Sequence, residues 1–286
     1  MTGRGAATRR WRGRVSGIAA RNRLVGPVLA LALAVTGVEL RAEPVAVRHT
    51  EGLVHGFLVL RTLDGRAIAD GDLSQVPSGA QVTSRLTFRF RDGSLHDETV
   101  VFTQRERFRL VSYRLVQRGA SFPRPLEMTI DVATGDVRVR HSDDEGESKV
   151  DTERMELPAD LANGMMSVLL KNVRPGAVPS LSFVAATPKP RLVKLEISPA
   201  PADRFTVGWR GRTATHYVVK PELGGVAGLV APLVGKQPPD AHVWIMGGTA
   251  PAFVRAEQTL YTGGPVWRIE LTSPAWPKSP ARRAGG

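Results

Sequence analysis

The feature that most constrains the fold is a two-residue alternation of apolar and polar side chains that begins soon after residue 50. It is clearest in residues 81–90, where one face carries Val82, Ser84, Leu86, Phe88 and Phe90. The intervening positions carry Gln, Thr and Arg. Side chains of a β-strand point alternately to its two faces, so this pattern predicts a strand with one buried and one solvated face.

Similar runs recur along the chain, separated by turn signals such as Asp92-Gly93 and Thr134-Gly135. The predicted strands are residues 54–61, 81–90, 95–102, 108–116, 126–131, 136–140, 180–185, 191–198, 205–208, 213–223, 242–246, 252–258 and 266–273. Strands joined by tight turns pair in antiparallel fashion. The chain is therefore expected to be mainly β, forming a large curved antiparallel sheet or half-barrel with one main helix.

That helix is predicted between residues 158 and 171. Pro158 and Asp160 mark its start, and apolar residues recur at spacings of three or four up to Lys171. Asn172 and the Pro175-Gly176 pair close it. Only one face is apolar, so we expect the helix to lie over the open side of the sheet.

Residues 1–42 are expected to be a signal peptide. An Arg-rich segment is followed by an apolar run over residues 24–38, which suits a signal peptide and is short for a membrane-spanning helix. Ala42 supplies the small residue at the cleavage position. Retention of this run as a membrane anchor is the alternative. We therefore expect the protein to be periplasmic or secreted.

The mature chain is expected to form a single β-rich domain over residues 43–277, followed by a disordered tail over residues 278–286. Residues 141–160 include an acidic run and are the one plausible point of subdivision. A single domain is favoured over two because each half has few strands and no linker of its own.

The formal net charge of +12 does not indicate a nucleic-acid-binding protein. Eight Arg against one Glu lie within residues 1–42, so most of the excess belongs to the predicted leader. The remaining chain lacks the basic stripe that binding to phosphates requires. The chain also has no Cys, which excludes a disulfide framework, a thiolate metal site and a thiol nucleophile.

Catalytic motifs are absent from the mature sequence, which predicts that the protein is not an enzyme and needs no cofactor or metal. None of the six His lies at a metal-ligand spacing from another. His96, Asp97 and Glu98 are adjacent, but alternation sends Asp97 to the face opposite the other two. These three are expected to be solvated polar residues.

The most unusual local feature is the uncharged segment of residues 224–235, which contains four Gly and a Pro. We interpret it as a mobile apolar flap that covers a hydrophobic cavity or touches a lipid surface. The alternative is a segment folded into the core. Trp244 is added to the candidate site because its ring can stack on a sugar or another ring of a ligand, with a place in the core or at its rim as the alternative. The predicted ligand-binding residues are Val226, Leu229, Val230, Leu233, Val234 and Trp244.

The order of these elements resembles a family of uncharacterised secreted bacterial proteins. The resemblance rests on the secreted leader, the antiparallel meander, the helix up to Lys171, and the closing strands around residues 214–219 and 266–271. That family is thought to share the half-barrel of periplasmic lipoprotein carriers, in which a curved sheet holds an apolar groove beneath helices. The resemblance implies this architecture and no functional residue.

The preferred interpretation is a non-catalytic binding or carrier-like protein that holds a lipid, another apolar molecule or an envelope partner, with possible peripheral membrane contact. One alternative is an extracytoplasmic hydrolase whose site is assembled from distant residues, such as His216 with an acidic partner from another strand. Another is a structural envelope protein without a ligand.

Overall fold

The computed structural model describes residues 44–143, 145–174, 176–177, 179–207, 209–222 and 238–272. All of them belong to one compact unit, Arg41–Gly286. The strands are β1 (Val54–Thr62), β2 (Ala67–Ser78), β3 (Gln81–Phe90), β4 (Leu95–Gln104), β5 (Phe108–Arg118), β6 (Leu126–Asp131), β7 (Asp136–Ser142), β8 (Ser148–Arg154), β9 (Ser180–Ala185), β10 (Arg191–Val207), β11 (Arg210–Glu222), β12 (Ala241–Met246), β13 (Ala252–Thr259) and β14 (Val266–Leu271). The described helix is α1 (Met166–Asn172).

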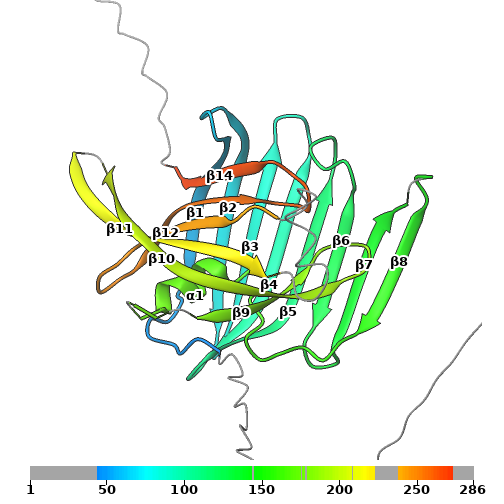
Figure 1. Cartoon of the computed structure of the whole chain (residues 1–286), viewed down its shortest axis with the longest axis horizontal. Coiled ribbons are helices and arrows are strands. Elements are labelled where there is room, and N and C mark those ends of the chain that lie inside the picture. Colours follow the sequence, from blue (N-terminus) through cyan, green and yellow to red (C-terminus); the bar gives the residue numbers. More distant parts are fainter. Residues whose placement is uncertain are drawn as a thin grey trace, which may run out of the picture. The chain divides into compact units, whose positions relative to one another are not determined.

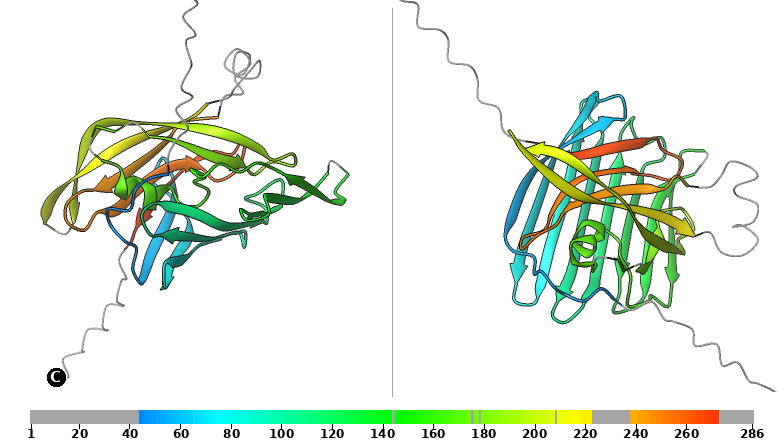
Figure 2. Two further views of the ribbon diagram at one scale, coloured as in Figure 1. Left: turned by 90° about the horizontal axis from the view of Figure 1, so that it is seen from below. Right: turned by 60° about the vertical axis from the view of Figure 1, so that its left-hand side comes forward.

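All fourteen strands belong to one sheet, in the order β8-β7-β6-β5-β4-β3-β2-β1-β14-β13-β12-β11-β10-β9. Strand β1 pairs with β14, and every other pair of neighbours is consecutive in the chain. The sheet thus has the connectivity of an up-and-down barrel in which only β8 and β9 fail to pair. It curves so that β9–β14 form one layer over β1–β8, with α1 between the layers (Figures 1 and 2). The mainly β fold class predicted from the sequence is confirmed.

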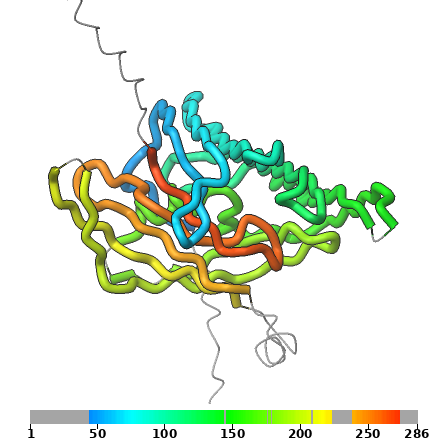
Figure 3. The backbone as a smooth tube through the Cα atoms, turned by 90° about the horizontal axis from the view of Figure 1, so that it is seen from above, coloured from blue at the N-terminus to red at the C-terminus, as the bar shows by residue number. Residues whose placement is uncertain are grey.

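The core lies between these layers, which are also visible in the backbone trace of Figure 3. One cluster of buried apolar side chains includes inward residues of both layers and of α1. Gly71 on β2 is part of this packing, because a Cβ there would lie 2.5 Å from the ring of Phe88 and 2.9 Å from Leu58. Gly71 weakens the sequence signal of β2 and at the same time makes room for Phe88.

The helix is shorter than predicted. Residues 158–165 form turns and a bridge, and the helix begins only at Met166. Gly164 has a φ of +68°, a left-handed conformation that ends any regular helix at this point. The segment before it bonds to β9 instead: the Ala162 amide donates to Ser182, and the Ser182 amide donates to Asp160. The predicted start at Pro158 and Asp160 is therefore wrong.

Three further differences concern strands. Strands β2 and β8 are absent from the sequence prediction, and residues 191–198 and 205–207, predicted as parts of two separate strands, belong to a single strand, β10. The register of β10 against β11 shifts between Ala200 and Asp203, immediately beside Pro199 and Pro201. Proline lacks an amide donor, and the bulge accommodates it within a strand that continues beyond it.

A strap formed by residues 44–51 ties α1 to the layer that contains β1–β8. Its backbone pairs with the chain before β5, where the Val47 amide donates to Glu106 over 2.9 Å. The Asn172 side chain, at the end of α1, accepts from the amides of Arg48 and His49 over 2.8 and 2.7 Å. The strap therefore fixes the end of the helix between the layers.

Candidate functional site

The inward face of β2, β3 and β4 carries a row of three side chains that pack against the core without being fully buried. Leu73 is opposite Leu86, and Leu86 is opposite Glu98. Opposed residues on one face of a sheet lie roughly 5 Å apart, so the row is continuous. All three keep accessible surface, whereas Leu115 and Met128 farther along the same row are buried. The described side chains thus leave this part of the inward face open to contact.

Glu98 is the polar member of the row. Its Oε1 accepts a hydrogen bond of 2.7 Å from the Tyr113 hydroxyl, the one side-chain hydrogen bond of Glu98 within the described part of the chain. Desolvation raises the pKa of the Glu98 carboxyl, although the bond from Tyr113 opposes this effect. Desolvation, followed by the nearby carboxylate, raises the pKa of Tyr113 well above its ordinary value. The Glu98 carboxyl is thus desolvated although the residue keeps some accessible surface.

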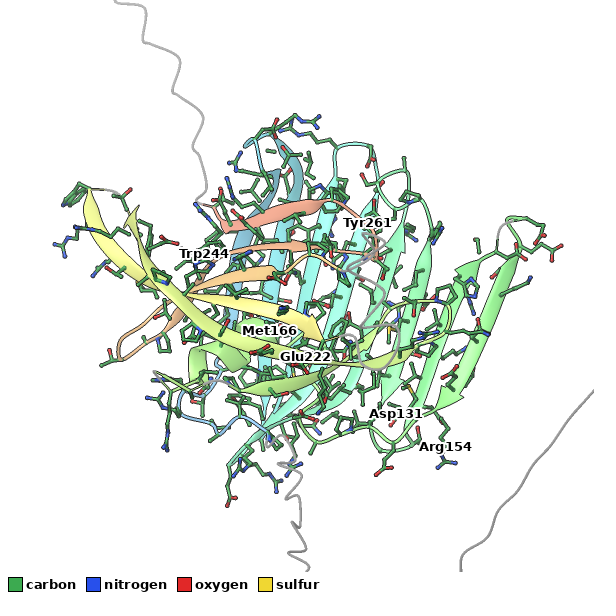
Figure 4. The ribbon with its side chains drawn as sticks, viewed as in Figure 1. Asp131, Arg154, Met166, Glu222, Trp244 and Tyr261 are labelled. Atoms are coloured by element: carbon green, nitrogen blue, oxygen red, sulfur yellow. The ribbon has the colours of Figure 1, made fainter. Side chains whose placement is uncertain are left out.

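Gly164 positions Tyr113 from the other side. A Cβ at Gly164 would lie 3.1 Å from Val100 and 3.2 Å from the Tyr113 ring. The turn leading into α1 therefore packs directly on the ring whose hydroxyl holds Glu98. Met166, labelled in Figure 4, begins the helix two residues later and is itself only partly buried.

A second polar pair lies on the same inward face. The amide nitrogen Nε2 of Gln117 lies 3.1 Å from His96 Nδ1 and 2.6 Å from the Leu260 carbonyl oxygen. An amide nitrogen donates, so His96 Nδ1 accepts and the ring is neutral. Burial lowers the pKa of His96 to about 4, against a weaker opposing effect of the Asp97 charge. His96 and Glu98 were expected to be solvated, and the structure shows that both point inward.

This burial makes stability depend on pH. The pKa of His96 in the folded protein lies below its ordinary value of 6.5, so its contribution is complete above pH 6.5 and is lost as the pH falls towards 4. The expected loss is about 3 kcal/mol of unfolding free energy. Urea denaturation of the wild type and of His96→Phe between pH 4 and 7 measures this loss. It is the fall in unfolding free energy with pH that the wild type shows and the variant lacks. Parallel pH profiles would contradict the assignment.

The open edge at β8 is charged on its inward face. Asp151 is opposite Val139 and Glu153 is opposite Val137, and both Val side chains belong to the core. His141 Nε2 lies 2.8 Å from Asp151 Oδ2. Inward charges on an edge strand discourage further strand pairing, which explains why the sheet ends here.

Five of the predicted ligand-binding residues lie outside the described residues: Val226, Leu229, Val230, Leu233 and Val234. Trp244 is described and lies on the face of β12 opposite the core, because its neighbours Val243 and Ile245 both join the core cluster. It is almost fully buried there, in contact with the side chains of His216 and Arg255.

The residues around Trp244 form an outer-face cluster that joins distant parts of the sequence. Trp244 Nε1 donates to Asp203 Oδ2 over 2.6 Å. The His216 ring stacks on the indole with 4.3 Å between ring centroids, and Arg255 Cζ lies 5.5 Å from the centroid of the Trp244 ring. His216 Nε2 lies 2.9 Å from His242 Nδ1. Desolvation and the neighbouring His242 lower the pKa of His216.

This cluster brings His216 near an acidic partner from another strand, as the hydrolase alternative required. Asp203 Oδ2 lies 3.8 Å from His216 Nδ1. However, no hydroxyl group of the described chain is hydrogen-bonded to His216 or His242. Nor do three or more His, Asp or Glu side chains, among residues described here, converge to hold a metal ion. The geometry thus offers an oriented imidazole without a nucleophile beside it.

No protein-family model matches the chain, and no curated protein matches it at a significant level. One solved structure is similar to it. A beta-barrel-like protein of the domain of unknown function DUF1849 from Brucella abortus aligns over 78% of this chain and 98% of its own length. The identity is 10% and the TM-score is 0.46, so the likeness identifies neither a family nor a function. None of the described helices has the length and apolar character needed to span a bilayer.

Proposed function

We propose that this protein is an extracytoplasmic, non-catalytic binding module that holds an apolar ligand, or an apolar part of an envelope partner, between its two sheet layers. The observation that carries the proposal is the accessible inward row of Leu73, Leu86 and Glu98. Monomeric cores are normally packed to the density of organic crystals, so inward apolar side chains with accessible surface favour a binding role.

The row also suggests what kind of ligand fits. The two Leu side chains offer apolar contact, and the Glu98 carboxyl offers one oxygen beyond the one that Tyr113 occupies. An enclosed polar group is costly unless it is hydrogen-bonded, so a ligand group that bonds to Glu98 would be favoured. A hydroxyl or amide group on an otherwise apolar molecule has this chemistry.

The unpaired seam supports access to this space. The layers are continuous through β1 and β14 but are not hydrogen-bonded to each other between β8 and β9. A seam without a strand ladder opens at lower cost than a closed barrel wall. The leader-like sequence of residues 1–42 supports an extracytoplasmic location, where apolar molecules must cross water between membranes.

Filling the row is expected to block binding. Leu86→Trp should weaken binding of the apolar fluorophore N-phenyl-1-naphthylamine at least tenfold, or about 1.4 kcal/mol, because the larger ring occupies the accessible space. Leu192→Trp is the matched control, since Leu192 is exposed on β10. Fluorescence titration of the full-length protein measures both dissociation constants. Equal affinities in the two variants would contradict the proposal.

A further inference from the structure

The end of the β10–β11 hairpin projects from the sheet as a two-stranded arm (Figure 1). Strand β12 pairs with β11 only from Ala214 to Val219, and β9 pairs with β10 only up to Glu196. Beyond these points the two arm strands bond only to each other, with Phe205 opposite Arg212 and Val207 opposite Arg210. We refer to residues 204–213 as the arm.

The arm exposes large apolar side chains that nothing in the described chain covers. Trp209 is 90% exposed, the largest fraction among the exposed large hydrophobic residues of the described ranges, and Val207 is 61% exposed. Phe205 is half-buried on the same face as Val207. Single exposed apolar residues are common, but Trp209 and Val207 together at the tip of a projecting hairpin indicate a contact surface.

The charge of the arm is entirely positive. It contains Arg204, Arg210 and Arg212, all exposed, and no acidic residue. Asp203, immediately before the arm, accepts a hydrogen bond from Trp244 at the base. Arg210 and Arg212 lie on the face of Phe205 and Val207, so apolar and cationic groups are presented together.

We propose that the arm docks on an anionic lipid bilayer, with Trp209 and Val207 in the interfacial region and the three Arg on lipid phosphates. Trp is enriched at the membrane interface because its ring is apolar and its N–H is polar. Exposed Arg are attracted by anionic headgroups, and each contributes about fivefold to binding. A protein partner would need a complementary surface of about 800 Å², whereas a bilayer accepts a narrow tip without matching its shape.

The absence of Cys from the sequence permits a local test. Val207→Cys carrying a nitroxide label is mixed, in the full-length protein, with phosphatidylglycerol-containing or pure phosphatidylcholine vesicles. The label should become more accessible to oxygen and less accessible to a water-soluble nickel complex only with the anionic vesicles, and salt should reverse the change. Val76→Cys, at an exposed position on β2, is the control label and should not respond.

A charge reversal tests the Arg. Arg210→Glu with Arg212→Glu should weaken binding of the arm to the anionic vesicles by at least about 30-fold, as read from the label at residue 207. Arg138→Glu with Arg140→Glu is the matched control, because these two Arg are exposed on β7. An unresponsive label at residue 207, or equal losses in both double variants, would overturn the proposal. Binding of N-phenyl-1-naphthylamine without vesicles should be unchanged in the arm variants, which separates this proposal from the binding function.

Discussion

Lys171→Met is expected to lower the free energy of unfolding by about 3–5 kcal/mol, because it leaves a buried charge without its partner. Lys171 Nζ lies 2.7 Å from Glu51 Oε2, and the two side chains are only 15% and 5% exposed. The pair joins the last turn of α1 to the end of the strap. Guanidinium denaturation at neutral pH measures the loss as a shift of the midpoint at constant slope.

The control for this prediction is the double variant Glu51→Leu with Lys171→Met. Replacing both members of a buried ion pair by apolar residues is often neutral or stabilising, so the double variant should recover most of the loss. Glu51 also exchanges two hydrogen bonds with Gln104, but these involve its backbone and remain in both variants. A double variant as unstable as the single one would show that the pair is not the cause.

Strands with two unlike faces were well predicted from the sequence. Strands β3, β6 and β9 have the predicted limits, and β3 and β6 largely alternate between buried and more exposed positions. Turns such as Asp92-Gly93 fixed their ends, since Gly93 has the positive φ that the turn requires. The period of two depends on local geometry alone, so a single sequence is enough to reveal it.

The missed elements depend on contacts with distant residues. Strand β2 contains Gly71, whose purpose becomes clear only when Phe88 is placed against it. Strand β8 is an edge strand whose only apolar residue is the exposed Val150, so it has no apolar–polar alternation to detect. The helix prediction extended too far because Asp160 and Ala162 bond to β9, which follows them in the chain.

The candidate site shows the same division. Alternation placed His96 and Glu98 on one face, and continuing it to Val100 and Phe102, both in the core, would have shown that this face is inward. The role of Glu98 depends on Tyr113 and on the turn at Gly164, and no short-range pattern joins these residues. The flap lies outside the described residues, so its predicted role remains a prediction.

Asn163→Ala is expected to destabilise the protein by about 4 kcal/mol. Asn163 is fully buried, its Nδ2 donates to the Val184 carbonyl over 2.9 Å, and its Oδ1 accepts from the Val184 amide over 2.9 Å. Together with the backbone bonds between residues 160–162 and Ser182, the side chain thus takes the place of a neighbouring strand along the outer edge of β9. Alanine leaves a buried donor and a buried acceptor unpaired, each at a cost of about 1–3 kcal/mol.

The residues that lose hydrogen-exchange protection in Asn163→Ala distinguish this mechanism from a simple loss of packing. Native-state hydrogen exchange should show the Val184 amide losing protection beyond the global decrease, whereas the Val82 amide on β3 should follow only the global change. A Val184 amide that stays as protected as Val82 would contradict the proposed edge role. The argument extends to the seam. The outer edge of β9 is covered by the backbone of residues 160–162 and by the Asn163 side chain, and β8 carries inward charges, so neither edge needs the other as a pairing partner.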